Sequence, residues 1–346
     1  MTSVELHAGQ SAMRREAAEA GKAVIRFLAH NEANLKQLAD RLRASPPNVV
    51  VTCARGSSDH AATFGKYLIE TRLGVPVSSA APSVASVFSS EMRQTGALLI
   101  AVSQSGRSPD LVATVERYKA AGAFVVAIVN QPDSPMEALA DCFMPLCAGP
   151  ELSVAATKSF VVSLSALAAI TAWWSDDAAL KLALADLPAL LDRAHDLDWS
   201  AMVEALVDAR NLLVVGRGYG LAVAQEAALK LKETCGLHAE AFSSAEVRHG
   251  PMAIVGKDFP VLALATSDNS GDDVRTLADE FAGRGARVIL ADCSGGAGQL
   301  PAFPAHPVIE PIVLIQSFYG AAERLARARG LEPDSPPFLR KVTETR

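Results

Sequence analysis

Short apolar runs alternate with longer stretches of helical spacing along most of this chain. The runs lie at 49–53, 75–79, 98–102, 124–129, 142–146, 211–215, 259–265 and 287–291. The main helical stretches lie at 60–73, 111–121, 221–235, 272–282 and 311–329. Apolar strands that alternate with helices are typical of parallel sheets covered on both faces. The pattern therefore predicts an α/β fold with two mainly parallel, doubly wound sheets of the flavodoxin type.

Further helical patterns lie outside this alternation. Residues 7–44 have amphipathic spacing, 153–174 has the pattern of a long buried helix, and 176–199 is a helical stretch that Pro188 is expected to break. These changes of pattern predict four segments. They are an N-terminal helical segment at 1–44, a first α/β domain at 45–175, a helical linker at 176–200 and a second α/β domain at 201–346.

The two α/β halves can be laid over one another. Three landmarks repeat at nearly one offset, which indicates an internal duplication. Ligand sites are then expected at the carboxyl ends of the strands in each half. The pairs, at offsets of 162, 164 and 163 residues, are Arg55-Gly56 with Arg217-Gly218, Val102-Ser103 with Thr266-Ser267, and Gly122-Ala123 with Gly285-Ala286.

Composition narrows the class of protein. The net charge is −6 with charges interspersed, so we expect no nucleic-acid partner. The first residues lack the pattern of a signal peptide, and the apolar stretch 160–174 is too short and too interrupted by hydroxyl residues for a membrane span. The five cysteines show neither a disulfide framework nor ligand spacing. We therefore expect a cytoplasmic protein without a membrane partner.

The most informative loop follows the apolar run that ends at Val102. Ser103, Gln104, Ser105 and Ser108 stand between that strand and a predicted helix, where unpaired backbone N–H groups can hold an anion. A simple helix cap is the alternative interpretation. Because Ser57 follows the end of another strand of the same sheet, the two loops are expected to converge, which favours a phosphate site.

The second half carries charged residues on a predicted helix. Glu226 and Lys230 are four residues apart, and Glu233 lies near the end of this helix, where it could act as a general base. Ordinary ion pairs on a solvated face are the alternative. His249 precedes a Gly-Pro turn and is interpreted as an acid or base. His238, Glu246 and His249 do not match a known ligand spacing, so we expect no metal and no other cofactor.

The C-terminal residues form a charged tail that contains two prolines. Pro336 and Pro337 stiffen it, and Phe338 and Leu339 are expected to anchor it. Lys341 could then be delivered into a site as an amine nucleophile.

These motifs resemble the sugar isomerase (SIS) family. The sequence looks like a tandem pair of SIS domains, similar to the isomerase half of glucosamine-6-phosphate synthase and to stand-alone glucosamine-6-phosphate deaminases. The residues that carry the resemblance are Met13-Arg14-Arg15-Glu16, Ser103-Gln104-Ser105-Gly106, 151–158, 229–233, His238-Ala239-Glu240, 246–251 and Lys341-Val342-Thr343.

The resemblance implies a role for each candidate residue. Glu233 would move the proton between C1 and C2, with Lys230 assisting. His249 would open the sugar ring and can come from a neighbouring subunit of a homodimer, and Lys341 would form a Schiff base. The implied phosphate ligands are Ser57, Ser103, Gln104, Ser105 and Ser108, and the implied pocket-lining residues are Val154 and Arg340.

The sequence departs from the synthase in three places and at its start. Arg107 replaces an acidic residue, Ala156 a serine and Pro337 an arginine, and we expect no glutaminase domain before the first helix. We therefore expect conversion of glucosamine 6-phosphate to fructose 6-phosphate and ammonia. The alternatives are an aminotransferase-like isomerase or deglycase for another phosphorylated amino sugar, and a sugar-phosphate sensor without catalysis.

Overall fold

A computed structural model describes residues 10–88, 93–296 and 298–341. These residues form two compact units, each built around one sheet. We call 22–149 with 162–185 the first-sheet unit, and 10–21, 150–161 and 186–341 the second-sheet unit. Residues 1–9 of the predicted helical segment, and Val342 and Thr343 of the tail motif, lie outside the described residues. The four segment boundaries drawn from the sequence stay predictions.

The first sheet has five strands in the order β2-β1-β3-β4-β5, and all its pairings are parallel. This is the flavodoxin-type order, and it confirms the predicted fold class. Its central strand β3 is buried along its whole length, as expected for a parallel strand with both faces covered. The strands are β1 (Val49–Cys53), β2 (Val77–Ser79), β3 (Ala97–Ser103), β4 (Phe124–Val129) and β5 (Cys142–Pro145).

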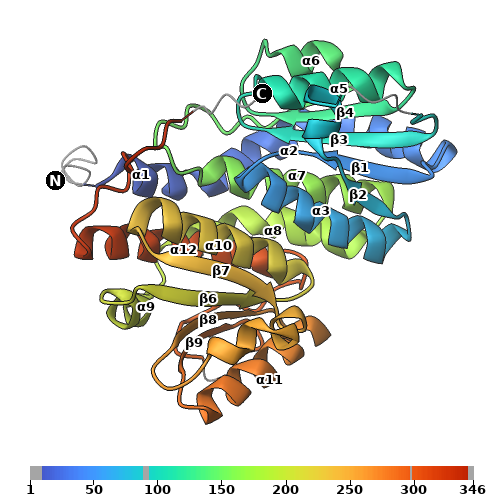
Figure 1. Cartoon of the computed structure of the whole chain (residues 1–346). Helices are drawn as coiled ribbons and strands as arrows, with labels where there is room; N and C mark the ends of the chain where they lie inside the picture. Colours follow the sequence, from blue (N-terminus) through green and yellow to red (C-terminus); the bar gives the residue numbers. More distant parts are fainter. Residues whose placement is uncertain (1–9, 89–92, 297, 342–346) are drawn as a thin grey trace. The chain divides into compact units, whose positions relative to one another are not determined.

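Helices cover both faces of this sheet (Figure 1). On one face, Leu111 and Val115 of α5 join the strand residues Val51, Leu99 and Val125 in a single apolar core. The helix α3 lies on the opposite face. The helices with residues in this unit are α2 (Ala20–Ala44), α3 (Ser57–Leu73), α4 (Pro82–Ser86), α5 (Pro109–Ala120), α6 (Pro135–Leu139), α7 (Lys158–Trp174) and α8 (Ala178–His195).

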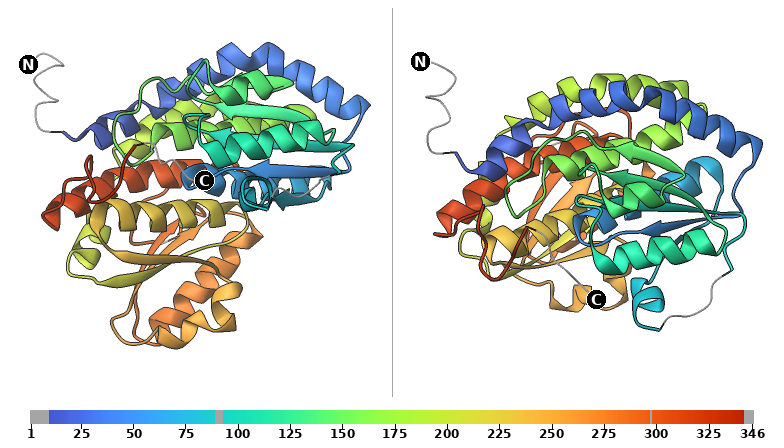
Figure 2. Two further views of the ribbon diagram at one scale, coloured as in Figure 1. Left: turned by 45° about the horizontal axis from the view of Figure 1, so that its top comes forward. Right: turned by 90° about the horizontal axis from the view of Figure 1, so that it is seen from above.

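The second sheet has four parallel strands in the order β7-β6-β8-β9. The helices α10 and α12 lie on one of its faces and α11 on the other (Figure 1 and Figure 2). α12 is buried on nearly all sides because α1, α9 and α10 pack around it. The elements are α1 (Ala12–Ala18), α9 (Ser200–Leu206), β6 (Asn211–Gly216), α10 (Tyr219–Cys235), β7 (His238–Ser243), β8 (Pro260–Ala265), α11 (Asn269–Gly283), β9 (Arg287–Asp292) and α12 (Glu310–Ala328).

Two expectations about individual elements are wrong, and one strand is not predicted by the sequence pattern. The helix expected from Ser153 begins at Lys158, because buried carboxylates bind the backbone of the preceding loop. Pro188 does not break α8, since a proline costs about 3 kcal/mol and the buried Leu184 and Leu191 beside it offset that loss. The strand β7 was not expected, because it is a polar edge strand that exposes His238.

Two further observations concern the class of protein. Among the described residues, no helix is both long enough and apolar enough to cross a membrane. All five cysteines are free thiols. Burial raises the pKa of Cys53 to about 12 and that of Cys235 to about 11, so these thiols stay protonated and unreactive at neutral pH.

Candidate active site

In the first-sheet unit, the loops after β1 and β3 lie side by side. The two strands are hydrogen-bonded neighbours, so their carboxyl ends meet at one edge of the sheet. Arg55 of the first loop donates two hydrogen bonds to one carboxylate oxygen of Asp110 at the start of α5, at 2.8 and 3.0 Å. This ion pair joins the loop that contains Ser57 to the loop that contains Ser103 to Ser108.

The hydroxyl groups of the β3–α5 loop shape its backbone. Ser103 Oγ accepts the Gly106 N–H at 3.0 Å, and Ser105 Oγ accepts the Arg107 N–H at 3.3 Å. Each hydroxyl keeps its own hydrogen to donate. Ser108 is the N-cap of α5, but its side chain makes no capping bond. Pro109 has no N–H group and the Leu111 N–H donates to the Asp110 carboxylate, so the loop's own hydroxyl and N–H groups, rather than the first turn of α5, are the donors for an anion.

In the second-sheet unit, α10 carries a buried ionic cluster. Lys230 Nζ donates a hydrogen bond to Glu233 Oε2 at 2.6 Å and lies 3.3 Å from Glu226 Oε1. The side chains of Lys230 and Glu226 are buried, whereas that of Glu233 is 20% exposed. Burial alone would lower the pKa of Lys230, but the charges and hydrogen bonds of both carboxylates outweigh it and raise that pKa. Lys230 is therefore a fixed cation that holds a reachable carboxylate in place.

A second buried ion pair joins the tail to the loop before α7. Lys341 Nζ donates a hydrogen bond to Glu151 Oε2 at 3.0 Å, and the Glu151 side chain is fully buried. Glu151 also accepts the backbone N–H groups of Thr157 and Ser159 and the Ser159 hydroxyl. Burial acts to raise the pKa of Glu151, but Lys341 and these hydrogen bonds outweigh it, so the pKa is lowered.

Tyr319 on α12 links the two ionic groups. Burial, followed by the charges of Glu226, Glu151 and Glu233, raises the pKa of its hydroxyl well above 10. All three carboxylates are thus near one phenol. Its oxygen is buried and has no hydrogen-bond partner among the described residues. Glu233 and Lys230 are thus in direct contact on α10, and Lys341 forms a separate ion pair with Glu151 in the same unit.

The tail is anchored differently from the prediction. Phe338 is fully exposed, at 105%, and Leu339 is 44% exposed, so neither holds the tail in place. The Asp334 carboxylate instead accepts the N–H groups of Ala12 and Met13 at the N-terminus of α1, at 2.6 and 2.8 Å. This contact is favourable because the helix N-terminus is electropositive and has unpaired donors.

The remaining predicted residues are placed more peripherally. The Val154 N–H donates to the Asp334 carbonyl at 3.5 Å, so Val154 lies beside the tail, and Arg340 is exposed. His249 is exposed at the end of a short 3-10 helix, Glu246–His249. Among the described residues, no hydrogen bond or ion pair joins His249 to Glu233 or Lys341. Within this part of the chain, no group of three or more His, Cys, Asp or Glu residues is placed to hold a metal.

Sequence reasoning missed Glu151 and Tyr319 as members of this region. Glu151 stands in a motif that we quoted for its family resemblance, but its 190-residue separation from Lys341 left no local signal. Tyr319 lies in an apolar helix that is buried almost throughout, where an aromatic residue is expected for packing alone. Only the tertiary structure shows their proximity to charged groups.

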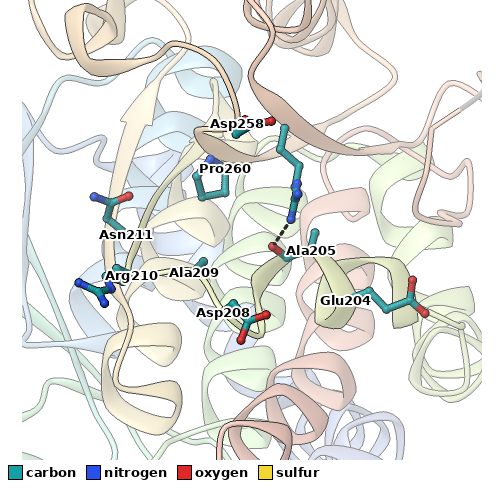
Figure 3. A pocket seen from close by; sticks show the side chains of 9 residues that line it. Glu204, Ala205, Asp208, Ala209, Arg210, Asn211, Asp258 and Pro260 are labelled. Atoms are coloured by element: carbon teal, nitrogen blue, oxygen red, sulfur yellow. Dashed lines mark hydrogen bonds between the residues drawn. The ribbon is translucent and has the colours of Figure 1, made fainter.

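The second-sheet unit also has an open hollow at the amino ends of its strands (Figure 3). Its volume is about 280 Å³, and it lies where strands β6, β8 and β9 begin. Arg287 there donates a hydrogen bond to the Ala205 carbonyl at 3.3 Å. None of the candidate residues lines this hollow. The residues that line it are Glu204, Ala205, Asp208, Ala209, Arg210, Asn211, Asp258, Pro260 and Arg287.

Comparison with known proteins identifies curated relatives that are larger than this chain. The glutamine–fructose-6-phosphate aminotransferase (isomerizing) of Thermotoga maritima is 33% identical over 88% of this chain and 51% of its own length. The enzyme of the same name from Thermococcus kodakarensis is 33% identical over 94% of this chain and 55% of its own length. The chain thus spans about half the length of these relatives.

Solved structures agree with these matches. A protein of Silicibacter pomeroyi DSS-3, assigned as a phosphosugar isomerase, superposes with a TM-score of 0.89 at 44% identity. That match covers 94% of this chain and all of the other. The C-terminal domain of glucosamine-fructose-6-phosphate aminotransferase from Francisella tularensis gives a TM-score of 0.84 at 27% identity, over 94% of this chain and 98% of that one.

A family model described as the SIS domain matches twice along the chain, at residues 45–172 and 205–297. The two matched segments contain the first and second sheets respectively, in agreement with the internal duplication. They also cover more than half of the sequence. The chain belongs to the SIS-domain family.

Proposed function

We propose that this protein is an amino-sugar phosphate isomerase and deaminase that converts glucosamine 6-phosphate to fructose 6-phosphate and ammonia. The observation that carries the proposal is the α10 cluster. A buried lysine cation holds a partly exposed carboxylate, in the same region as the tail amine of Lys341. A solvated helix face would not bury Lys230 and Glu226, so the alternative of ordinary surface ion pairs does not explain the cluster.

The chemistry assigned to these groups is a proton shift between C1 and C2 of an open-chain sugar. Glu233 takes the proton from one carbon and returns it to the other, because its carboxylate is the exposed member of the cluster. Lys230 orients that carboxylate and stabilises the negative charge that develops on the neighbouring oxygens. Lys341 supplies an amine that can form a Schiff base with the carbonyl group.

The phosphate is assigned to the first-sheet unit. Ser57 and the loop residues Ser103, Gln104, Ser105 and Ser108 provide hydroxyl, amide and backbone donors at strand and helix ends. An anchor that is remote from the reacting carbons lets binding energy orient the substrate. This part of the proposal rests on the hydroxyl-rich loop, whose Ser108 side chain makes no capping bond, and on the Arg55–Asp110 link between the two loops.

Ring opening is assigned to His249 of a second copy in a homodimer. His249 is exposed and lies at an irregular turn, a position from which it can reach another subunit. The cytoplasmic location belongs to the same proposal, and the protonated thiols are compatible with it.

The relatives support the substrate class. The curated relatives are named as aminotransferases that act on fructose 6-phosphate, and the Silicibacter protein is assigned as a phosphosugar isomerase. Because this chain matches only about half of the aminotransferases, the source or fate of the ammonia needs a direct assay.

The test is ammonia release from a panel of amino-sugar 6-phosphates, with fructose 6-phosphate plus ammonia as the reverse assay. We expect turnover of glucosamine 6-phosphate and a loss of about 10²- to 10⁴-fold in Glu233→Gln, because general-base catalysis is removed. Glu204→Gln, which changes an exposed glutamate of α9, is the matched control and should keep the parent rate.

Other outcomes of this assay would revise the proposal. Turnover of a different panel member would identify another phosphorylated amino sugar as the substrate. Tight binding of one sugar phosphate without turnover of any would favour a sensor. Parent-rate ammonia release by Glu233→Gln would show that Glu233 is not the base.

A further inference from the structure

We infer that Glu151 is the proton acceptor that converts the Lys341 ammonium group into the amine that attacks the substrate carbonyl. This inference rests on the proposed function, because it concerns the Schiff base assigned to Lys341. It adds a role for a buried residue that the sequence had not marked as catalytic. Its basis is the contact between Glu151 Oε2 and Lys341 Nζ, at 3.0 Å.

The two partners differ in their freedom. Glu151 is fixed by three donors from the start of α7, namely the Thr157 and Ser159 N–H groups and the Ser159 hydroxyl, at 2.7 to 3.1 Å. Lys341 lies in the tail, and its side chain is 24% exposed. The carboxylate is therefore a stationary group, whereas the amine has access to a ligand.

The environment of Glu151 allows it to hold a proton in turn. Its charge is stabilised by Lys341 and by these three donors, and two further titratable groups interact with it, Glu16 of α1 and Tyr319 of α12. Neither of these compensates a negative charge. While Lys341 is a neutral amine or part of the neutral carbinolamine, Glu151 has no cation at its Oε2 atom, and burial then favours its neutral form.

The proposed step balances in protons and charge. The Lys341 ammonium gives one proton to the Glu151 carboxylate, and the amine lone pair forms a bond to the carbonyl carbon. The second N–H proton moves to the carbonyl oxygen and yields a carbinolamine. Glu151 returns its proton to this hydroxyl, the C–O bond breaks, and water leaves as the protonated imine forms. Glu151 ends as it began, as a carboxylate.

The inference is tested by the pH dependence of imine formation. Fructose 6-phosphate and cyanoborohydride trap the imine as a stable adduct, whose initial rate of formation is measured from pH 6 to 9.5 by intact-protein mass spectrometry. We expect a nearly flat profile for the parent. Glu151→Gln should form the adduct at least about tenfold more slowly at pH 7 and gain rate steeply as the pH rises, because hydroxide then replaces the missing carboxylate as the proton acceptor.

Glu310→Gln is the matched control. Glu310 is also a buried carboxylate of the second-sheet unit, and it accepts the backbone N–H groups of Ser267 and Ala305, but it makes no hydrogen bond to Lys341. We expect this variant to keep the pH profile of the parent. Its measured rates also correct for the pH dependence of the reductant. Glu151→Asp keeps a carboxylate, so it should keep a flat profile at a reduced rate.

The outcomes separate this inference from the function on which it rests. If Glu151→Gln lowers the rate by the same factor at every pH, Glu151 only anchors the loop and the inference is wrong. Should Glu151→Gln fail to fold, a steep profile for Glu151→Asp would overturn it instead. If the parent forms no adduct and turns over no amino-sugar phosphate, the proposed function fails and the inference falls with it.

Discussion

The helices α3 and α10 occupy the same place in the two duplicated halves and differ in what they bury. Both have 17 residues, at an offset of 162, and each begins after a glycine with φ near 55° and ends at a left-handed glycine. At that offset, Glu226 and Lys230 of α10 correspond to the buried Phe64 and Leu68 of α3. One backbone thus carries an apolar interface in one half and an ionic cluster in the other.

The loops that follow the central strands differ in a complementary way. In the second half, Asp268 caps α11 and accepts the N–H groups of Ser270 and Gly271, so the protein's own carboxylate fills the helix N-terminus. In the first half, the Ser108 side chain makes no such bond, and Asp110 in the first turn of α5 accepts only the Leu111 N–H and pairs with Arg55. The comparison teaches that the duplicated halves keep the same helix and loop positions but differ in the charges that they bury and in how their helix N-termini are capped.

The largest expected effect comes from removing the cation of α10. Lys230→Met should cost roughly 3–5 kcal/mol of unfolding free energy, because it leaves the buried Glu226 without a partner. The matched change on α3, Leu68→Met, should cost less than about 1.5 kcal/mol, since it conserves volume in an apolar site. Urea unfolding measures both. Equal losses would mean that the cluster is not the distinguishing feature of α10.

The next effect concerns the shape of the β3–α5 loop. Gly106 has φ of +64°, and an added Cβ would lie 2.5 Å from Ser134 Oγ and 2.8 Å from Val129 Cγ1. Gly106→Ala should therefore cost roughly 1–3 kcal/mol and weaken sugar-phosphate binding. Gly256→Ala, where a Cβ meets open space, is the control and should change stability by less than about 0.5 kcal/mol. Unimpaired binding by Gly106→Ala would argue against a phosphate site in this loop.

A smaller effect compares the two caps directly. Asp268→Ala should cost about 1 kcal/mol, because it removes capping bonds from α11. Ser108→Ala should cost less than about 0.5 kcal/mol and instead lower the affinity for fructose 6-phosphate. Thermal unfolding and calorimetric titration of both variants provide the measurements. A stability loss in Ser108→Ala that equals the loss in Asp268→Ala would remove the contrast between the loops.

The smallest effect is a pH dependence of stability. Because the pKa of Glu151 is lowered from 4.5 on folding, its carboxylate stabilises the fold above that pH, and this contribution is lost as the pH falls through the folded-state pKa. The difference in unfolding free energy between the parent and Glu151→Gln should therefore shrink as the pH falls below about 4.5.

Glu16 is expected to show a pH dependence of stability with the opposite sign. Burial raises its pKa above 4.5, so the ionised form destabilises the fold as the pH rises through the folded-state value. Glu16→Gln should gain stability relative to the parent over that range. Parallel pH profiles for the two variants would contradict the assignment of the charges.

Much of the fold could be predicted from the sequence because buried parallel strands leave continuous apolar runs. β1 and β4 have the predicted bounds, and the other expected strands differ by at most two residues at either end. The edge strand β7 left no such run, because His238 and Glu240 point to solvent. Patterning thus predicts strands in proportion to their burial.

The candidate site was less predictable, because its contacts join distant parts of the chain. The i, i+3 and i, i+4 spacing on α10 was visible locally, and the structure places Lys230 between its two carboxylates. The pairing of Glu151 with Lys341 depends on tertiary structure alone. The apolar Phe338 suggested the wrong anchor for the tail, since Asp334 at a helix N-terminus holds it instead.

The central claim is that the first half binds the phosphate and the second half moves the proton. It is tested most directly by measuring, on Glu233→Gln and Ser105→Ala, both fructose 6-phosphate affinity by calorimetry and deuterium incorporation at C1 in D2O. We predict that Glu233→Gln binds within about threefold of the parent but loses at least about 100-fold in exchange. Ser105→Ala should lose about tenfold in affinity, because it removes one hydrogen bond to the charged phosphate. Its rate of deuterium exchange at saturating fructose 6-phosphate should fall by a smaller factor. The claim would be contradicted if Glu233→Gln lost mainly affinity and Ser105→Ala mainly exchange, or if each variant lost both by equal factors.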